Sequence, residues 1–214
     1  MVIEVRNVCK SFKNINVLNN VNMTFESGRI YGINGRNGSG KSVLLKILCG
    51  IYYPSSGCVL YDGKESSSEV IISSNIRALI ENPSFFPSLT GFENLKVLAK
   101  IQNKISDKDI DWALKSVNLF QEKNKKYSEY SLGMKQKLGI AQVIMENPQV
   151  LVLDEPFNGI EEESVKKITK FLINEKNKGK IIILSSHIKD DLENISDVIY
   201  RFDAGNVTIL KNKE

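Results

Sequence analysis

The sequence lacks any apolar stretch long enough to cross a membrane. Its longest aliphatic runs, at residues 150–153 and 181–184, have four residues each, whereas a membrane-spanning helix needs about 20 predominantly apolar residues. A secretory leader is not expected either, because Glu4 and Arg6 interrupt the first residues. We therefore expect a soluble polypeptide.

The sequence also has few cysteines and only a small net charge. The three cysteines, at positions 9, 49 and 58, have no metal-ligand spacing, and an odd number without a leader indicates reduced thiols in a cytosol. The 29 basic and 25 acidic residues leave a net charge of +4, which is too small to favour nucleic acid or a membrane surface as the main partner. No nucleic-acid partner is expected.

The first 30 residues alternate polar and apolar side chains in short runs, which predicts an antiparallel strand region. The pattern then changes. Residues 29–33 form a strand candidate that enters a glycine-rich turn, and apolar residues at helical spacing follow it up to Gly50. After a turn at residues 52–57, residues 58–62 indicate another short strand.

Residues from about 83 to 147 show mostly helical patterns. Thr90 and Glu93 have the spacing of a capping box, and Ser106 and Asp109 form a second one ahead of an apolar stripe. After Pro148, a helix-like stretch separates the two aliphatic runs, the pattern of buried parallel strands joined by a crossover. We expect one α/β domain over residues 1–214, in which a helical segment of about 84–147 is inserted.

Residues 35–42 read Gly-Arg-Asn-Gly-Ser-Gly-Lys-Ser and match the phosphate-loop motif G-x-x-x-x-G-K-[ST] in full. Glycines let successive backbone N–H groups point into one concavity, and the following helix presents its positive end to phosphate oxygens. Lys41 should reach the β- and γ-phosphates, and the Ser42 hydroxyl should bind Mg²⁺. The alternative is a flexible glycine turn, although a chance match is on the order of one per cent. The residues expected to hold the nucleotide here are Asn37, Gly38, Ser39, Gly40, Lys41, Ser42 and Val43.

A second motif is an apolar strand that ends in Asp154 and Glu155. Such a strand delivers its last side chains into the crevice where α/β sheets bind ligands. Asp154 would hold Mg²⁺, and Glu155 would polarise the attacking water as general base. The alternative is that the acids only solvate the end of the strand.

The two motifs and their spacing resemble the ATP-binding cassette (ABC) family, and further landmarks occur in order across nearly the whole chain. The resemblance implies a P-loop NTPase with a RecA-like, mostly parallel sheet, an N-terminal antiparallel β-subdomain and an inserted helical subdomain. Phe12 stands where the family stacks an aromatic ring on adenine, although an ordinary core aromatic would fit as well. His187, the only histidine, stands in the place of the switch histidine, which would bond the γ-phosphate and the attacking water.

Residues 130–136 occupy the place of the family's L-S-G-G-Q signature. In the family this helix start meets the γ-phosphate of ATP bound to the other subunit, so Ser131 and Gly133 should contact nucleotide there. Ser131 is also a plausible N-cap, and a simple helix start is the local alternative. Residues 158–161 match the loop that touches the partner subunit.

The departures from the family pattern are informative. Glu81 stands where most members have a glutamine that touches Mg²⁺ and the membrane partner, so we expect retained metal contact with altered coupling. Leu132 and Met134 replace residues of the signature, and Glu161 replaces an aspartate. Residues 80–83 together with 131–136 look most like the bacitracin- and lantibiotic-resistance branch.

The resemblance implies an ATPase that dimerises around two ATP molecules with Mg²⁺, as a homodimer or with a close paralogue. It would lie at the cytoplasmic face of the membrane and power separate integral membrane permease subunits that export a peptide, an antibiotic or another amphipathic compound. Phe85 and Phe86 could line a groove for a permease helix or could belong to the core. The alternatives are a soluble ABC-type machine, a phosphate-loop kinase and a nucleotide-gated binding protein without turnover.

Overall fold

The structure is a computed structural model that describes residues 1–73, 75–81 and 84–212. The predicted antiparallel region is a four-stranded sheet with strand order β2-β1-β4-β5. The first two strands pair from Val2 opposite Glu26 to Phe12 opposite Ile15, which confirms the alternation of the first 30 residues. The strands of this sheet are β1 (Val2–Phe12), β2 (Ile15–Glu26), β4 (Ser56–Tyr61) and β5 (Lys64–Glu65).

A six-stranded sheet with strand order β10-β9-β3-β8-β7-β6 forms the centre of the molecule. Its strands are β3 (Arg29–Gly35), β6 (Ile76–Leu79), β7 (Val150–Asp154), β8 (Ile181–Ser186), β9 (Val198–Asp203) and β10 (Asn206–Asn212). Neighbouring strands are parallel except for the β9–β10 pair. The two aliphatic runs are thus buried parallel strands, as predicted, with α6 (Glu162–Asn177) between them in the chain.

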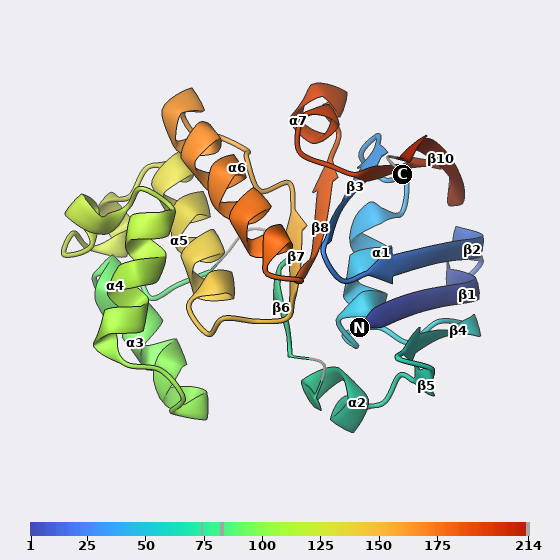
Figure 1. Ribbon diagram of the computed structural model, residues 1–214, viewed down its shortest axis with the longest axis horizontal. Helices are drawn as coiled ribbons and strands as arrows, with labels where there is room; N and C mark the ends of the chain where they lie inside the picture. Colours follow the sequence, from blue (N-terminus) through green and yellow to red (C-terminus); the bar gives the residue numbers. More distant parts are fainter. Residues whose placement is uncertain (74, 82–83, 213–214) are drawn as a thin grey trace.

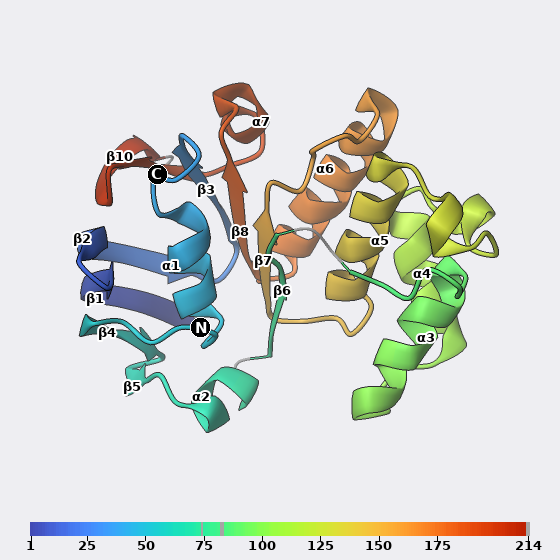
Figure 2. The ribbon, with the colours of Figure 1, turned by 180° about the vertical axis from the view of Figure 1, so that it is seen from behind.

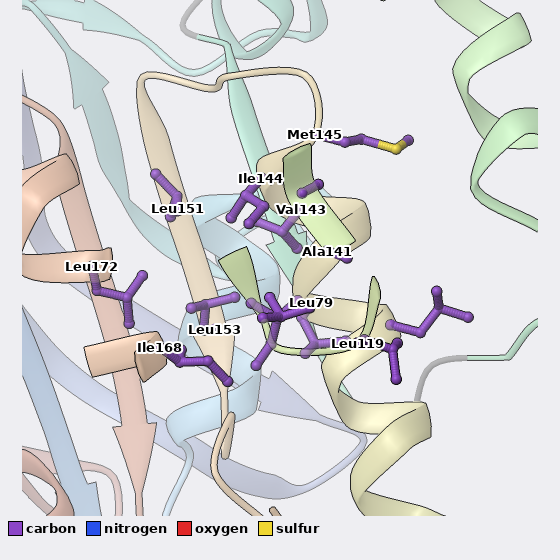
Figure 3. Close-up of a cluster of buried hydrophobic side chains, with 14 of the residues drawn as sticks. Leu79, Leu119, Ala141, Val143, Ile144, Met145, Leu151, Leu153, Ile168 and Leu172 are labelled. Atoms are coloured by element: carbon purple, nitrogen blue, oxygen red, sulfur yellow. The ribbon is translucent and has the colours of Figure 1, made fainter. Parts of the chain in front are cut away.

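Alternate residues of β7 and β8 belong to two separate cores. Val150 and Ile181 pack with α1 (Lys41–Leu48) and the N-terminal sheet. Leu151 and Ile182 pack on the opposite face, against α5 (Leu132–Ile144) and α6, and Figure 3 shows this second cluster. A strand that is covered on both faces must be apolar at every position, which explains the unbroken aliphatic runs.

The predicted helical segment contains α3 (Gly91–Gln102), α4 (Asp107–Ser116), two short 3₁₀ turns (Phe120–Glu122 and Tyr127–Glu129) and α5. It lies on the far side of the six-stranded sheet from β1 and β2 (Figures 1 and 2). Both predicted capping boxes are present, with the side chains of Glu93 and Asp109 accepting from the backbone N–H groups of Thr90 and Ser106. These observations confirm the fold class, while the limits of 84–147 for a helical subdomain stay a prediction.

Two short helices complete the fold, α2 (Ser68–Ser73) and α7 (Lys189–Glu193). Neither was predicted, and the same holds for β6, β9 and β10. Across the described ranges 1–73, 75–81 and 84–212, no helix has the length and apolar character needed to cross a bilayer.

Candidate nucleotide-binding site

The phosphate loop joins the end of β3 to the start of α1. Gly38 and Gly40 have φ angles of 79° and 106°. Residues other than glycine adopt this left-handed region only at a cost. A Cβ atom on Gly40 would also lie 2.9 Å from the carbonyl oxygen of Val17 and from Cδ2 of Leu18. Glycine is therefore required at position 40 by both conformation and space.

The loop encloses a cavity of about 240 Å³ at the carboxyl edge of the six-stranded sheet. Its lining brings together all seven predicted residues of the loop and helix start with both predicted acids, Asp154 at the end of β7 and Glu155 directly after it. The lining residues are Val17, Asn37, Gly38, Ser39, Gly40, Lys41, Ser42, Val43, Asp154 and Glu155. Val17 was not predicted, since nothing in an alternating strand marks the one residue that faces a distant loop.

Lys41 is nearly buried, at 5 % exposure, and its ammonium is held by the loop itself. Nζ donates to the carbonyl oxygens of Gly35 and Arg36 at 2.7 and 3.3 Å, and it lies 3.7 Å from Oε1 of Glu155. A full positive charge therefore faces the cavity, where it can meet phosphate oxygens as a point charge.

Two further polar atoms at the cavity lack a hydrogen-bond partner within the described residues. They are Oγ of Ser39 and Oε1 of Glu155, and both are buried. Buried polar groups are normally paired, so these atoms indicate that a polar ligand completes the site. The unpaired hydroxyl, the N–H groups at the start of α1 and the Lys41 ammonium together fit a phosphate chain.

Ser42 and Asp154 form the part of the site that suits a divalent cation. Oγ of Ser42 donates to Oδ2 of Asp154 at 2.6 Å, while the Ser185 hydroxyl donates to the other oxygen, Oδ1. Within the described residues, no group of three or more His, Cys, Asp or Glu side chains could hold a metal. One hydroxyl and one carboxylate match Mg²⁺, which keeps several waters and shares substrate phosphates.

Glu155 is held in a strained conformation at the end of β7. Its φ of 47° is uncommon outside glycine and costs on the order of 1–3 kcal/mol. Its N–H donates to the carbonyl and hydroxyl oxygens of Ser185 at 3.2 and 3.1 Å, and its carbonyl accepts from Nε2 of Gln136 at 3.1 Å. These bonds orient the Glu155 carboxylate toward His187, whose Nδ1 lies 2.9 Å from Oε2 of Glu155. The structure thus brings the three predicted catalytic residues, Glu155, His187 and Lys41, together. Sequence reasoning missed Ser185 and Gln136.

Glu81 lies just beyond β6, with a positive φ of 65°. It lines a second cavity of about 230 Å³ together with Gln136, Asp154, Glu155 and Asn158. The carboxylate is paired with the ammonium of Lys46. Asn82 and Pro83, which contribute to the resemblance at 80–83, lie outside the described residues.

Phe12 is placed differently, at the end of β1 and outside the lining of the phosphate cavity. Its ring is 39 % exposed and packs edge-on against Tyr52 with 5.5 Å between ring centroids. This exposure shows that Phe12 is not an ordinary core residue. Its contact with adenine stays a prediction.

Ser131 and Gly133 do not line the phosphate cavity of their own chain. Ser131 is the N-cap of α5, where its hydroxyl accepts from the N–H of Met134 at 3.2 Å. A Cβ on Gly133 would lie 2.3 Å from the carbonyl oxygen of Gly159, so the signature helix lies directly against the loop after β7. Their contact with nucleotide stays a prediction.

An ion pair that was not predicted ties the same loop to the same helix. Nζ of Lys137 donates to Oε1 of Glu161 at 2.7 Å, and Ser164 donates to the same oxygen at 2.6 Å. The Lys137 ammonium, followed by the Ser164 hydroxyl, lowers the pKa of Glu161 to about 2. No sequence signal links Lys137 to Glu161, which lies 24 positions further along the chain.

A glycine-rich loop between a strand and a helix, with a hydroxyl and two acids facing it, defines a P-loop nucleoside triphosphatase. The sequence pattern of one family within that class, described as ABC transporter, matches residues 18–158. This chain belongs to the ABC transporter family, as one of its ATP-binding and ATP-hydrolysing subunits.

Curated relatives support the assignment over nearly the full chain. An uncharacterized ABC transporter ATP-binding protein of Bacillus subtilis, YybJ, is 40 % identical over 96 % of this chain and 94 % of its own length. The bacitracin transport ATP-binding protein BcrA of Enterococcus faecalis is also 40 % identical, over 92 % of this chain, which spans only 65 % of that relative. The lantibiotic transport ATP-binding protein SrtF of Streptococcus pyogenes is 33 % identical over 98 % of this chain and 90 % of its own length.

Solved structures agree on the fold. The dimeric ATP-binding cassette MJ0796 bound to ADP and Pi superposes with a TM-score of 0.87 at 23 % identity, covering 98 % of this chain and 99 % of that chain. The cbiO1 subunit of Clostridium perfringens gives a TM-score of 0.81 at 28 % identity, covering 96 % of this chain and 86 % of that chain. This likeness confirms the predicted P-loop fold with its antiparallel and helical additions.

Proposed function

We propose that this chain hydrolyses ATP to drive a separate membrane permease that exports a peptide, an antibiotic or another amphipathic compound. ATP hydrolysis is supported most directly by the contact of His187 with Glu155, which lines the cavity of the phosphate loop. Two relatives that are named for bacitracin and lantibiotic transport support the substrate class. The work would take place at the cytoplasmic face of the membrane.

The phosphate loop binds the triphosphate through its backbone N–H groups and the residues from Asn37 to Val43. Lys41 exchanges its bonds to the loop carbonyls for phosphate oxygens, so its ammonium, which is already buried, does not have to be desolvated again. The N–H groups at the start of α1 favour the same anion, since no side chain caps that helix. Phe12 stacks on the adenine ring.

Ser42 and Asp154 would hold Mg²⁺, and the Glu81 carboxylate, which lines the second cavity, would be a further oxygen ligand. When bound, the ion supplies positive charge that offsets the charge of the β- and γ-phosphate oxygens. Ser185 holds the Asp154 carboxylate from its other oxygen, which keeps it oriented toward Ser42.

Glu155 accepts the proton of the attacking water, and His187 orients the carboxylate and bonds the γ-phosphate. General-base catalysis by a positioned carboxylate contributes about 10²–10⁴-fold. The strained backbone of Glu155 fits this role, because such strain is retained at functional sites where surrounding bonds over-determine it.

A complete site requires a second subunit, which is either an identical copy or a close paralogue. Ser131 and Gly133 then contact the γ-phosphate of the nucleotide in the partner, in agreement with their absence from the cavity of their own chain. The segment of about 84–147 acts as the helical subdomain and carries the contact with the permease. Phe85 packs against the core, with its ring centroid 5.3 Å from that of Tyr127, whereas Phe86 is exposed. Phe86 is therefore the better candidate for the contact with the permease.

Isolation of the tagged chain from detergent-solubilised membranes tests the proposal. We expect an integral membrane protein to co-purify with it. We also expect the fractions that contain this complex to release phosphate from ATP. Cells that lack the chain should become more sensitive to bacitracin or a lantibiotic. Phosphate release without any membrane partner would favour a soluble ABC-type machine instead.

A further inference from the structure

Lys46, in the last turn of α1, makes an ion pair with Glu81 on the loop after β6. The Lys46 side chain is 18 % exposed, whereas that of Glu81 is 65 % exposed. Glu81 has a left-handed φ of 65°, which a residue other than glycine adopts at a cost and which persists only where contacts hold it. The ammonium of Lys46 supplies such a contact.

The Glu81 carboxylate needs a counter-charge because of its surroundings. It shares the lining of one cavity with the carboxylates of Asp154 and Glu155, and a triphosphate in the adjoining cavity would add further negative charge. Negative charges that share one cavity repel each other, and they do so more strongly where bulk water is excluded. The Lys46 ammonium offsets one of these charges.

The Lys46 ammonium also lies over the ring of Tyr52, which forms an aromatic pair with Phe12. Nζ of Lys46 lies 5.4 Å from the centre of the Tyr52 ring, and this ring packs edge-on against Phe12 at 5.5 Å. Nζ of Lys10 lies 5.0 Å from the centre of the Phe12 ring and 5.7 Å from the centre of the Tyr52 ring. An aromatic face attracts a cation placed over it, so Lys46 also helps to fix the Tyr52 ring.

We propose that Lys46 is a positioning residue for nucleotide binding. It holds the Glu81 carboxylate in place as a counter-charge, and it connects that carboxylate through Tyr52 to the ring of Phe12. The inference rests on the proposed function, because it assumes that ATP occupies the phosphate cavity. Lys46 acts through Glu81, so its effect should depend on the charge at position 81.

A double-mutant cycle in ATP affinity tests this dependence. The variants are Lys46→Met, Glu81→Gln and the double variant, and ATP binding to the purified chain is measured by calorimetry with EDTA and with Mg²⁺. With EDTA, we expect Lys46→Met to weaken ATP binding about five- to tenfold in the unmodified chain and less than twofold in the Glu81→Gln background. Lys46→Arg should bind ATP within about twofold of the unmodified chain, because it keeps the charge.

Lys96 provides a matched control, since it also pairs with a carboxylate and lies over an aromatic ring. Its Nζ is 2.7 Å from Asp107 and 5.7 Å from the centre of the Phe92 ring, within the helical segment. Lys96→Met should leave ATP affinity unchanged. Melting temperatures check that every variant folds, and Lys46→Gln replaces Lys46→Met in the cycle if the latter does not.

The outcomes separate the inference from the function on which it rests. A loss of ATP affinity that is equal in both backgrounds would overturn the inference, since Lys46 would then act independently of Glu81. No loss in Lys46→Met would overturn it as well. If the unmodified chain failed to bind ATP at all, the proposed function and the inference would both be wrong.

Discussion

Nδ1 of His187 lies 2.9 Å from Oε2 of Glu155. The two residues follow β8 and β7, which are adjacent parallel strands with Asp154 opposite Ser185. Parallel strands bring their carboxyl ends to one edge of the sheet, so side chains about 30 residues apart meet there. The pair therefore depends on the sheet and not on a flexible loop, and each member can be tested separately.

The first prediction concerns His187→Ala. Removing the imidazole leaves Glu155 without the group that orients it, so turnover should fall about 100-fold while ATP affinity changes less than threefold. Phosphate release and calorimetric ATP binding measure the two quantities. Turnover within twofold of the unmodified chain would exclude His187 from catalysis.

The second prediction concerns the metal. Asp154→Asn keeps the size of the side chain but removes its charge, so the Mg²⁺ concentration for half-maximal turnover should rise about tenfold or more. ATP binding in EDTA should change much less, because Asp154 then has no ion to hold. An unchanged Mg²⁺ requirement would contradict the assignment of Asp154 as a ligand.

The third prediction uses the depressed pKa of Glu161. The folded value of about 2 lies below the ordinary 4.5, so the stabilisation is fully present above pH of about 4.5 and is lost as pH falls toward 2. The Glu161 side chain is 54 % exposed, which limits the effect to about 1 kcal/mol. Urea unfolding should show Glu161→Gln less stable than the unmodified chain at pH 7, with a smaller difference at pH 3.

Glu163→Gln serves as the control for this measurement. Its carboxylate lies on the same helix, but it is 76 % exposed and pairs only with an exposed lysine one turn away. We expect a smaller loss of stability at pH 7 than for Glu161→Gln. A difference for Glu161→Gln that stays constant from pH 7 to pH 3 would contradict the role of the ion pair.

The fourth prediction tests whether the signature helix serves a second subunit. Ser131→Phe should abolish turnover without weakening ATP binding to the monomer, because Ser131 does not line the cavity of its own chain. Loss of the cap costs about 1 kcal/mol, so the melting temperature is followed in parallel. Ser128→Phe, at an exposed serine one turn earlier, should have little effect on turnover. Loss of monomer binding in Ser131→Phe would count against the second-subunit role.

Sequence patterns predicted the parts of the fold whose signal is local. The buried strands β7 and β8 have unbroken aliphatic runs, and α3 and α4 start at capping boxes. The strands β6, β9 and β10 were missed. β6 has only four residues, and β10 is largely exposed at the edge of the sheet, so neither shows a clear hydrophobic period. Their place is decided by pairing with distant strands.

The same distinction applies to the site. The phosphate loop is contiguous, and its spacing alone predicted the residues that line the cavity from Asn37 to Val43. Contacts between distant segments were missed, namely those of Val17, Ser185 and Lys137. Their residue types are ordinary on strands and helices. Only the tertiary structure brings Val17 to the phosphate loop, Ser185 to Asp154 and Lys137 to Glu161.

In the proposed mechanism, Glu155 is the base of an ATPase that works as a dimer. Phosphate release by the purified Glu155→Gln variant, with its oligomeric state in ATP, tests this most directly. We predict retained ATP binding, a loss of turnover of at least about 100-fold and an ATP-dependent shift from monomer to dimer in size-exclusion chromatography. Unchanged turnover would contradict the account, because the reaction would then proceed without the carboxylate that the structure places beside His187.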